Sequence, residues 1–197
     1  SKKLAELKKA EEPTNPTQPT KPVALKAATV KATATSYDKV KLTWKKVDGA
    51  ESYKIYRSTS KSSGYKNVKT VKTLTWTDSK LTTGKTYYYK VEATAKNATS
   101  STSKVVSAKP ALTVPSSVKA TSSSYNKATV TWKKVAGVTG YKVYRATSKN
   151  GSYKKVATVK TLKWTDSKLK TGKTYYYKVR AYKKTANSGY SKVVKAK

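Results

Sequence analysis

The chain has 197 residues, with 44 Lys and Arg against nine Asp and Glu, which gives a formal net charge of +35. Cysteine and histidine are absent, which excludes disulfides, thiolate chemistry and the commonest general base and metal ligand. No apolar run reaches the roughly 18 residues that a membrane-spanning helix needs. The excess of cations predicts attraction to an anionic partner or surface.

Residues 1–22 differ in composition from the rest of the chain. Ser1–Glu12 is rich in helix formers, and we expect it to be the remnant of a helix. Four prolines then follow at intervals of three residues: Pro13, Pro16, Pro19 and Pro22. They forbid a helix and favour an extended linker. We expect an upstream domain of a larger protein before this segment.

The remaining residues form a tandem repeat with a period of 88 residues, since Trp132 follows Trp44 at this distance. Three further aromatic pairs keep the same spacing: Tyr53/Tyr141, Trp76/Trp164 and Tyr87/Tyr175. We therefore predict two domains, residues 23–110 (repeat 1) and 111–197 (repeat 2). The junction between them is short, and we expect little bending there.

Inside each repeat, apolar residues alternate with lysine and threonine, as they do in half-buried strands. Clear cases are Val40–Trp44, Tyr53–Tyr56 and Tyr87–Ala93 in repeat 1. Turn signals such as "VDGA" and "TTGK" separate them. No stretch inside the repeats has a helical period, so the sequence predicts an all-β, antiparallel fold.

The order of these motifs resembles the fibronectin type III family. "VKLTW" followed by "YKIY" is similar to strands B and C of that family, and "WTDSKLTTGKTYYYKVEA" is similar to its E–F connection and strand F. The resemblance covers the chain from Val23 onward and implies two tandem seven-stranded, immunoglobulin-like sandwiches. The family's Arg-Gly-Asp tripeptide is absent. The Lys- and Thr-rich style is similar to secreted or cell-surface members of a bacterial, Gram-positive-like kind.

The resemblance also divides the two "TYYYKV" motifs into inner and outer residues. It implies a core of six aromatic side chains: Trp44, Tyr53, Tyr87, Trp132, Tyr141 and Tyr175. Tyr87 and Tyr175 correspond to the tyrosine corner, whose hydroxyl holds the E–F turn. Because strand side chains alternate between faces, Tyr89 then points inward, and Tyr88 and Lys90 point outward.

Strands C and F are neighbours in this family, so their outward residues share one face of the sheet. We predict that this face binds an anionic polymer or glycan, since aromatic rings stack and ammonium groups neutralise charge. The candidate residues are Lys54, Tyr56, Tyr88 and Lys90 in repeat 1, and Lys142, Tyr144, Tyr176, Lys178 and Arg180 in repeat 2. Cross-strand packing of tyrosine rings and lysine stems is the structural alternative.

The two repeats differ in charge. Repeat 1 has 18 Lys and Arg against five acidic residues (+13), and repeat 2 has 21 against one (+20). Three carboxylates of repeat 1 become neutral in repeat 2, and Glu92 becomes Arg180. Neither folding nor solubility requires this loss. We expect repeat 2 to bind more strongly to a partner such as teichoic acid, an acidic glycan or extracellular DNA.

Catalysis is not expected, and neither is a metal or another cofactor. Asp166 is the only acidic residue after Glu92, and no Ser–His or Cys–His arrangement can form. For Asp78 and Asp166, in the E–F region, a role in a turn or cap is the default.

We interpret the chain as a non-catalytic accessory or adhesion module of a secreted or cell-wall-associated protein. A purely structural spacer and a protein-binding adhesin module are the alternatives. Intracellular nucleic-acid binding is disfavoured, because the chain has only three arginines.

Overall fold

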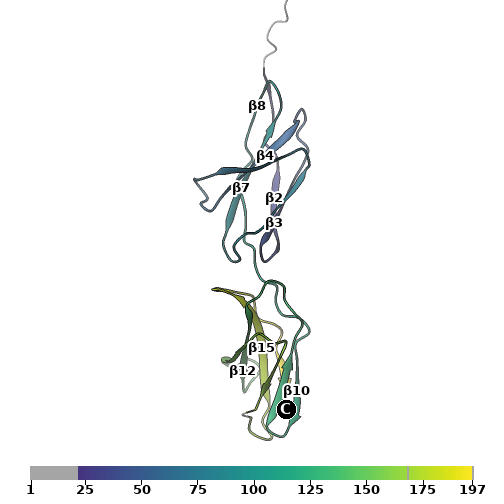
Figure 1. The fold of residues 1–197 in the computed structure, drawn as a ribbon, viewed down its shortest axis with the longest axis vertical. Helices are drawn as coiled ribbons and strands as arrows, with labels where there is room; N and C mark the ends of the chain where they lie inside the picture. Colours follow the sequence, from purple (N-terminus) through teal and green to yellow (C-terminus); the bar gives the residue numbers. More distant parts are fainter. Residues whose placement is uncertain (1–21, 168, 197) are drawn as a thin grey trace, which may run out of the picture.

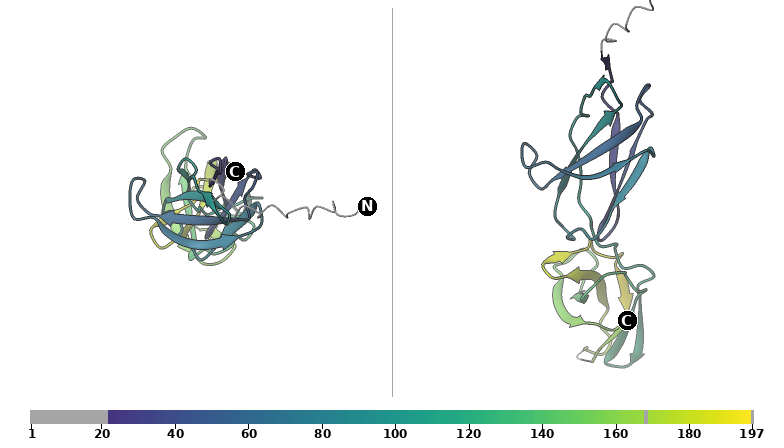
Figure 2. Two further views of the ribbon diagram at one scale, coloured as in Figure 1. Left: turned by 90° about the horizontal axis from the view of Figure 1, so that it is seen from above. Right: turned by 45° about the horizontal axis from the view of Figure 1, so that its top comes forward.

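The computed structural model describes residues 22–167 and 169–196, and the described residues contain strands but no helix. Two β-sandwiches lie end to end and meet at a narrow waist (Figures 1 and 2). The all-β prediction is confirmed. The predicted helix remnant and proline-rich linker lie, apart from Pro22, outside the described residues.

Repeat 1 folds into two facing antiparallel sheets. The first sheet has the strand order β2 (Val30–Ser36), β3 (Lys39–Trp44) and β6 (Thr75–Asp78). The second has the order β5 (Lys66–Val71), β4 (Ser52–Ser58), β7 (Tyr87–Thr94) and β9 (Val106–Ala108). A short parallel pair is formed by β1 (Val23–Ala24) and β8 (Ala98–Thr99). The two main sheets supply the seven strands that the resemblance implies.

Repeat 2 has the same two main sheets. Its first sheet has the order β10 (Lys119–Ser124), β11 (Lys127–Thr131) and β14 (Lys163–Asp166). In its second sheet, β13 (Lys154–Val159) pairs with β12 (Gly140–Ala146), which pairs with β15 (Tyr175–Lys183). Both β16 (Ala186–Asn187) and β17 (Val194–Ala196) pair with β15.

Each repeat has its own hydrophobic core between its two sheets. The alternation of the "YYYKV" strands is visible in burial: along β7 the side chains of Tyr87, Tyr89 and Val91 are buried, and those between them are half-buried. All six predicted core aromatics are buried, from 1% exposed at Tyr141 to 7% at Tyr87. In both repeats the core Trp packs at a tilt on the core Tyr of the next strand.

The hydroxyls of the core tyrosines bind backbone groups in the loops. Tyr87 Oη accepts a hydrogen bond from the Thr82 N–H (2.9 Å), and Tyr175 Oη accepts one from the Lys170 N–H (3.0 Å). This is the geometry of the tyrosine corner. The tyrosine hydroxyl thus gains a hydrogen-bond partner, and the bond holds the turn before β7 or β15 in place.

The structure corrects the expected role of the two E–F aspartates. Asp78 is buried rather than in a turn, and it accepts hydrogen bonds from Arg57 (2.9 and 3.1 Å) and from the Tyr89 hydroxyl (3.0 Å). Asp166 makes the equivalent contacts with Arg145 (2.7 Å) and Tyr177 (3.1 Å). A buried carboxylate needs such partners to remain charged. Two of the three arginines are therefore structural.

Candidate functional site

In repeat 1 the predicted binding residues do share one face. Across β4 and β7, Lys54 pairs with Glu92, Tyr56 with Lys90, and Ser58 with Tyr88. Along each strand the lysines and tyrosines of these pairs alternate with buried side chains, so they point away from the core. We call Lys54, Tyr56, Tyr88 and Lys90 the lysine–tyrosine face of repeat 1. All four are half-buried rather than fully exposed.

A carboxylate neutralises part of this face. The Tyr56 hydroxyl donates to Glu92 Oε2 at 2.6 Å, and this bond, together with burial, raises the pKa of Tyr56. Lys90 Nζ lies 4.3 Å from the centre of the Tyr65 ring. Tyr56 is thus bonded to a carboxylate, and Lys90 lies against an aromatic ring.

The equivalent face of repeat 2 is built from the same cross-strand pairs. Lys142 pairs with Arg180, Tyr144 with Lys178, and Ala146 with Tyr176. We call Lys142, Tyr144, Tyr176, Lys178 and Arg180 the lysine–tyrosine face of repeat 2. Again every residue is half-buried. Arg180 stands where repeat 1 has Glu92, so a cation replaces the carboxylate that adjoins the face of repeat 1.

On this second face, cations and rings alternate. Lys178 Nζ lies 4.2 Å from the Tyr153 ring centre and 4.1 Å from that of Tyr190, and the Arg180 guanidinium lies 4.6 Å from the Tyr190 ring. Tyr144 meets Tyr190 edge to face at 5.1 Å. Burial, followed by the contact with Tyr190, raises the pKa of Tyr144. Lys178 and Arg180 therefore both lie within cation–π distance of tyrosine rings.

Sequence reasoning missed the tyrosines that complete these faces. Tyr65 and Tyr153 are 88 residues apart, and this recurrence was a usable signal. Tyr190 stands where repeat 1 has Thr102, so no repeated tyrosine marked this position in the sequence. It belongs to the segment between β16 and β17, and only the fold brings it over β15.

A shallow cavity adjoins the face of repeat 2. It has a volume of about 320 Å³ and is lined by Lys149, Tyr176, Val193, Val194 and Lys195. The position of Lys195 is occupied by Ser107 in repeat 1. An anionic group with an apolar portion fits such a lining, because it combines two lysines with a tyrosine and two valines.

Comparisons with known proteins place this geometry in a family. The family model "Fibronectin type III domain" matches residues 113–197. Repeat 2 belongs to the fibronectin type III family. Domains of this family are commonly non-catalytic adhesion or structural modules of extracellular and surface proteins. No curated protein sequence matches the chain.

The chain is also similar to solved structures. A two-domain fibronectin type III segment of chicken tenascin is 18% identical with a TM-score of 0.55, covering 85% of this chain and 95% of that segment. The FN1–FN3 domains of chicken CNTN1 are 19% identical with a TM-score of 0.41, covering 88% of this chain and 66% of theirs. A Fn3-like protein from Clostridium thermocellum is 32% identical with a TM-score of 0.41, covering 45% of this chain and 92% of its own. The tenascin segment shows that the chain has a tandem fibronectin type III fold.

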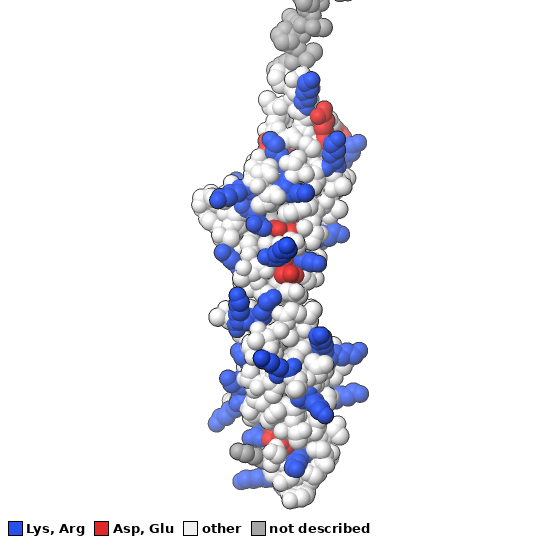
Figure 3. Space-filling view, viewed as in Figure 1, with Lys and Arg blue, Asp and Glu red and all other residues white. Residues whose placement is uncertain are grey.

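Cations are not confined to the lysine–tyrosine faces of these fibronectin type III sandwiches. Lys39 and Lys41 on β3, and Lys127 on β11, are exposed on the other sheet. Figure 3 shows Lys and Arg along both flanks of both sandwiches, with Asp and Glu mainly over repeat 1. The two lysine–tyrosine faces differ from the other sheets in the contacts between their cations and tyrosine rings, and not in the number of cations.

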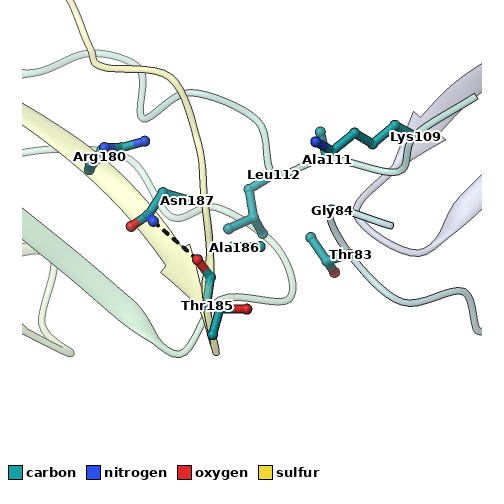
Figure 4. A pocket seen from close by; sticks show the side chains of 9 residues that line it. All are labelled: Thr83, Gly84, Lys109, Ala111, Leu112, Arg180, Thr185, Ala186 and Asn187. Carbon is teal, nitrogen blue, oxygen red and sulfur yellow. Dashed lines mark hydrogen bonds between the residues drawn. The ribbon is translucent and has the colours of Figure 1, made fainter. Parts of the chain in front are cut away.

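A larger cavity, of about 390 Å³, lies where the two sandwiches meet. Arg180 and Asn187 of repeat 2 line one side, Thr83 and Lys109 line the other, and Leu112 lies between them (Figure 4). The Arg180 guanidinium donates from Nε and Nη2 to the Ser188 carbonyl. Arg180 is therefore held between this cavity and the face of repeat 2, so the cationic surface continues to the waist.

Groups for metal binding do not gather anywhere in residues 22–167 and 169–196, where no three His, Cys, Asp or Glu side chains come together. Over the same residues, no helix is long and apolar enough to cross a membrane.

Proposed function

We propose that the chain is a non-catalytic attachment module that holds a secreted or cell-wall-associated protein at anionic extracellular polymers. Teichoic acid, an acidic glycan or extracellular DNA has the required chemistry. One observation carries the proposal: Asp166, the sole acidic side chain of repeat 2, is 3% exposed and paired with Arg145. Repeat 2 therefore presents cationic side chains to solvent without side-chain carboxylates among them.

The arrangement on the face of repeat 2 supports this binding physically. A free lysine loses side-chain entropy when a ligand fixes it, and rings that already restrict Lys178 reduce that loss. Their low polarity also strengthens attraction between the ammonium group and an incoming anion. A polymer that spans both repeats gains from avidity. Because the attraction replaces counterions on a polyanion, affinity falls steeply with salt.

The main experiment exchanges the two residues that distinguish the faces. In the full chain, Arg180→Glu with Tyr190→Thr gives repeat 2 the residues of repeat 1, and Glu92→Arg with Thr102→Tyr does the reverse. Binding is measured on poly(glycerol phosphate), polygalacturonate and double-stranded DNA at about 0.02 M and 0.5 M salt. We expect roughly tenfold weaker binding at low salt for the first variant and tighter binding for the second.

The lysine pairs give a matched control. Lys142→Glu with Lys178→Glu reverses charge on the face of repeat 2, and Lys54→Glu with Lys90→Glu does so at the equivalent positions of repeat 1. The first pair should weaken binding more. If wild-type protein ignores all three polymers at low salt, the attachment function is wrong and the spacer is the better account. Affinity for a protein that survives high salt would favour the protein-binding adhesin.

A further inference from the structure

At the waist, a tyrosine of repeat 1 packs on repeat 2. Tyr37 lies in the β2–β3 turn, and its ring contacts the β11–β12 loop at Gly137 and the core of repeat 2. Gly137 has a φ of +71°, and a Cβ there would lie 2.5 Å from the Tyr37 ring. Lys183 Nζ lies 4.2 Å from the centre of the same ring. Glycine is required here by both the turn and the ring.

The neighbouring β6–β7 turn completes this contact. The Thr83 hydroxyl donates to the Tyr37 carbonyl at 2.7 Å, which ties the two turns together. The Gly84 N–H donates to the Pro110 carbonyl at 2.7 Å, and a Cβ on Gly84 would lie 3.2 Å from Ala186 Cβ. Tyr37, Thr83 and Gly84 therefore form the end of repeat 1 that docks on repeat 2.

The same three residue types recur 88 positions later, at the opposite end of repeat 2, as Tyr125, Thr171 and Gly172. Gly172 has a φ of +75° against +82° at Gly84, so both glycines are in the left-handed region. Here the described residues do not cover it: Tyr125 is 78% exposed, and a Cβ on Gly172 would meet nothing within 4 Å. Both repeats thus have these docking residues, and within the described residues only those of repeat 1 are covered by another repeat.

We propose that Tyr125, Thr171 and Gly172 form a docking surface for a further fibronectin type III repeat. The fitting partner presents a glycine at the position of Gly137 and a lysine at that of Lys183, so that its loop accepts the Tyr125 ring as repeat 2 accepts Tyr37. This surface serves assembly, and it is independent of polymer binding. An exposed aromatic ring beside a preformed turn has little to reorganise on docking.

A second copy of this chain fits the surface less well. The corresponding end of repeat 1 has Ala95 where repeat 2 has Lys183, so the cation is missing. In addition, a Cβ on Gly49, the counterpart of Gly137, would meet Leu25 Cδ2 at 3.4 Å, because the repeat's own N-terminal segment already lies there. The occupant is therefore a repeat of the repeat 2 type.

The test joins a second copy of residues 110–197 directly after Lys197, which keeps the 88-residue spacing. Amide hydrogen exchange is followed in the Ser124–Lys127 and Lys170–Lys173 turns and compared with that of the original chain. We expect exchange in both turns to slow by about twofold to fivefold, the range that an exposed cation–aromatic contact supports. Tyr125→Ala should abolish this protection, and Tyr37→Ala should produce the same loosening at the existing joint.

Tyr190→Ala is the control, because it removes another exposed ring, which packs against Tyr144 and Lys178 instead of this end; it should leave the protection intact. Unchanged exchange in the extended chain, or protection that survives Tyr125→Ala, would overturn the proposal. Sedimentation of the original chain tests the other occupant: a dimer that Tyr125→Ala dissolves would show that a second copy docks instead. Neither failure would affect polymer binding by the single chain.

Discussion

The two repeats have the same interior and different exteriors. The core Trp and Tyr, the tyrosine corner and the buried Arg–Asp–Tyr group occupy equivalent positions in both, with similar distances. Outside, Glu92 is replaced by Arg180 and Thr102 by Tyr190. A surface carboxylate bonded to a tyrosine in repeat 1 thus gives way to a cluster of rings and cations in repeat 2.

The comparison shows that the fold does not depend on the acidic residues at the surface. Repeat 1 carries five acidic residues and repeat 2 carries one, yet both form the same pair of sheets. The single acid that repeat 2 keeps is the buried one. The fold therefore does not require the surface carboxylates that repeat 2 lacks. If the two interiors are equivalent, matched substitutions in them should cost the two repeats similar amounts of stability.

The largest effect is expected from the buried ion pairs. Asp78→Asn and Asp166→Asn each leave a partly buried arginine without its counterion. Breaking such a pair costs about 3 kcal/mol of unfolding free energy here, the low end of the usual range, because the Arg57 and Arg145 side chains are 34% and 28% exposed and can reach water. Hydrogen exchange of the core amides reads each repeat separately.

Asp48→Asn provides the control, since Asp48 is an exposed carboxylate of repeat 1. It should change stability by less than about 0.5 kcal/mol. A loss in only one repeat after the two buried substitutions would show that the interiors are not equivalent.

A second effect is expected in alkali. Burial, followed by the charge of the adjacent aspartate, raises the pKa of Tyr89 and Tyr177 far above the ordinary value. In the unfolded chain both ionise near pH 10. Above that pH the unfolded state loses protons that the folded state retains, so stability falls as pH rises, by about 1.4 kcal/mol per tyrosine at pH 11.

Urea unfolding at pH 9 and pH 11 measures this loss. Tyr89→Phe and Tyr177→Phe should each remove one tyrosine's share of the pH dependence, whatever they do to stability at pH 9. An unchanged slope in either variant would mean that lysine deprotonation dominates.

These interiors also show how far sequence reasoning reached. Alternation and the 88-residue period are local signals, so the strands, the two faces and the core aromatics followed from the sequence. The Asp78–Arg57 pair did not, because it joins β6 to β4 across the sandwich, and no local pattern marks which aspartate is buried. Tyr190 was missed for the same reason: its loop reaches β15 only through the tertiary fold.

A smaller effect is expected at the tyrosine corners. Tyr87→Phe and Tyr175→Phe keep the ring but leave the Thr82 and Lys170 N–H groups without their acceptor. We expect a loss of about 1 kcal/mol in each repeat. Thermal unfolding measures the loss, and hydrogen exchange locates it in the turn before β7 or β15. Faster exchange elsewhere, with the turn unaffected, would contradict a local role for the hydroxyl.

The smallest effect is expected from the contact between Lys183 and the Tyr37 ring at the joint. Lys183→Ala introduces the residue that repeat 1 has at Ala95 and removes the cation from the Tyr37 ring, which should weaken the joint by about 0.5 kcal/mol. Exchange in the β2–β3 turn of repeat 1 and in the β11–β12 loop of repeat 2 should then speed up by roughly twofold. Lys184→Ala, one residue along and exposed, removes the same charge without touching the ring. If both variants behave alike, the joint depends on net charge; if only Lys183→Ala acts, the joint depends on the ring contact, and the docking end of repeat 2 needs a partner with a lysine at that position.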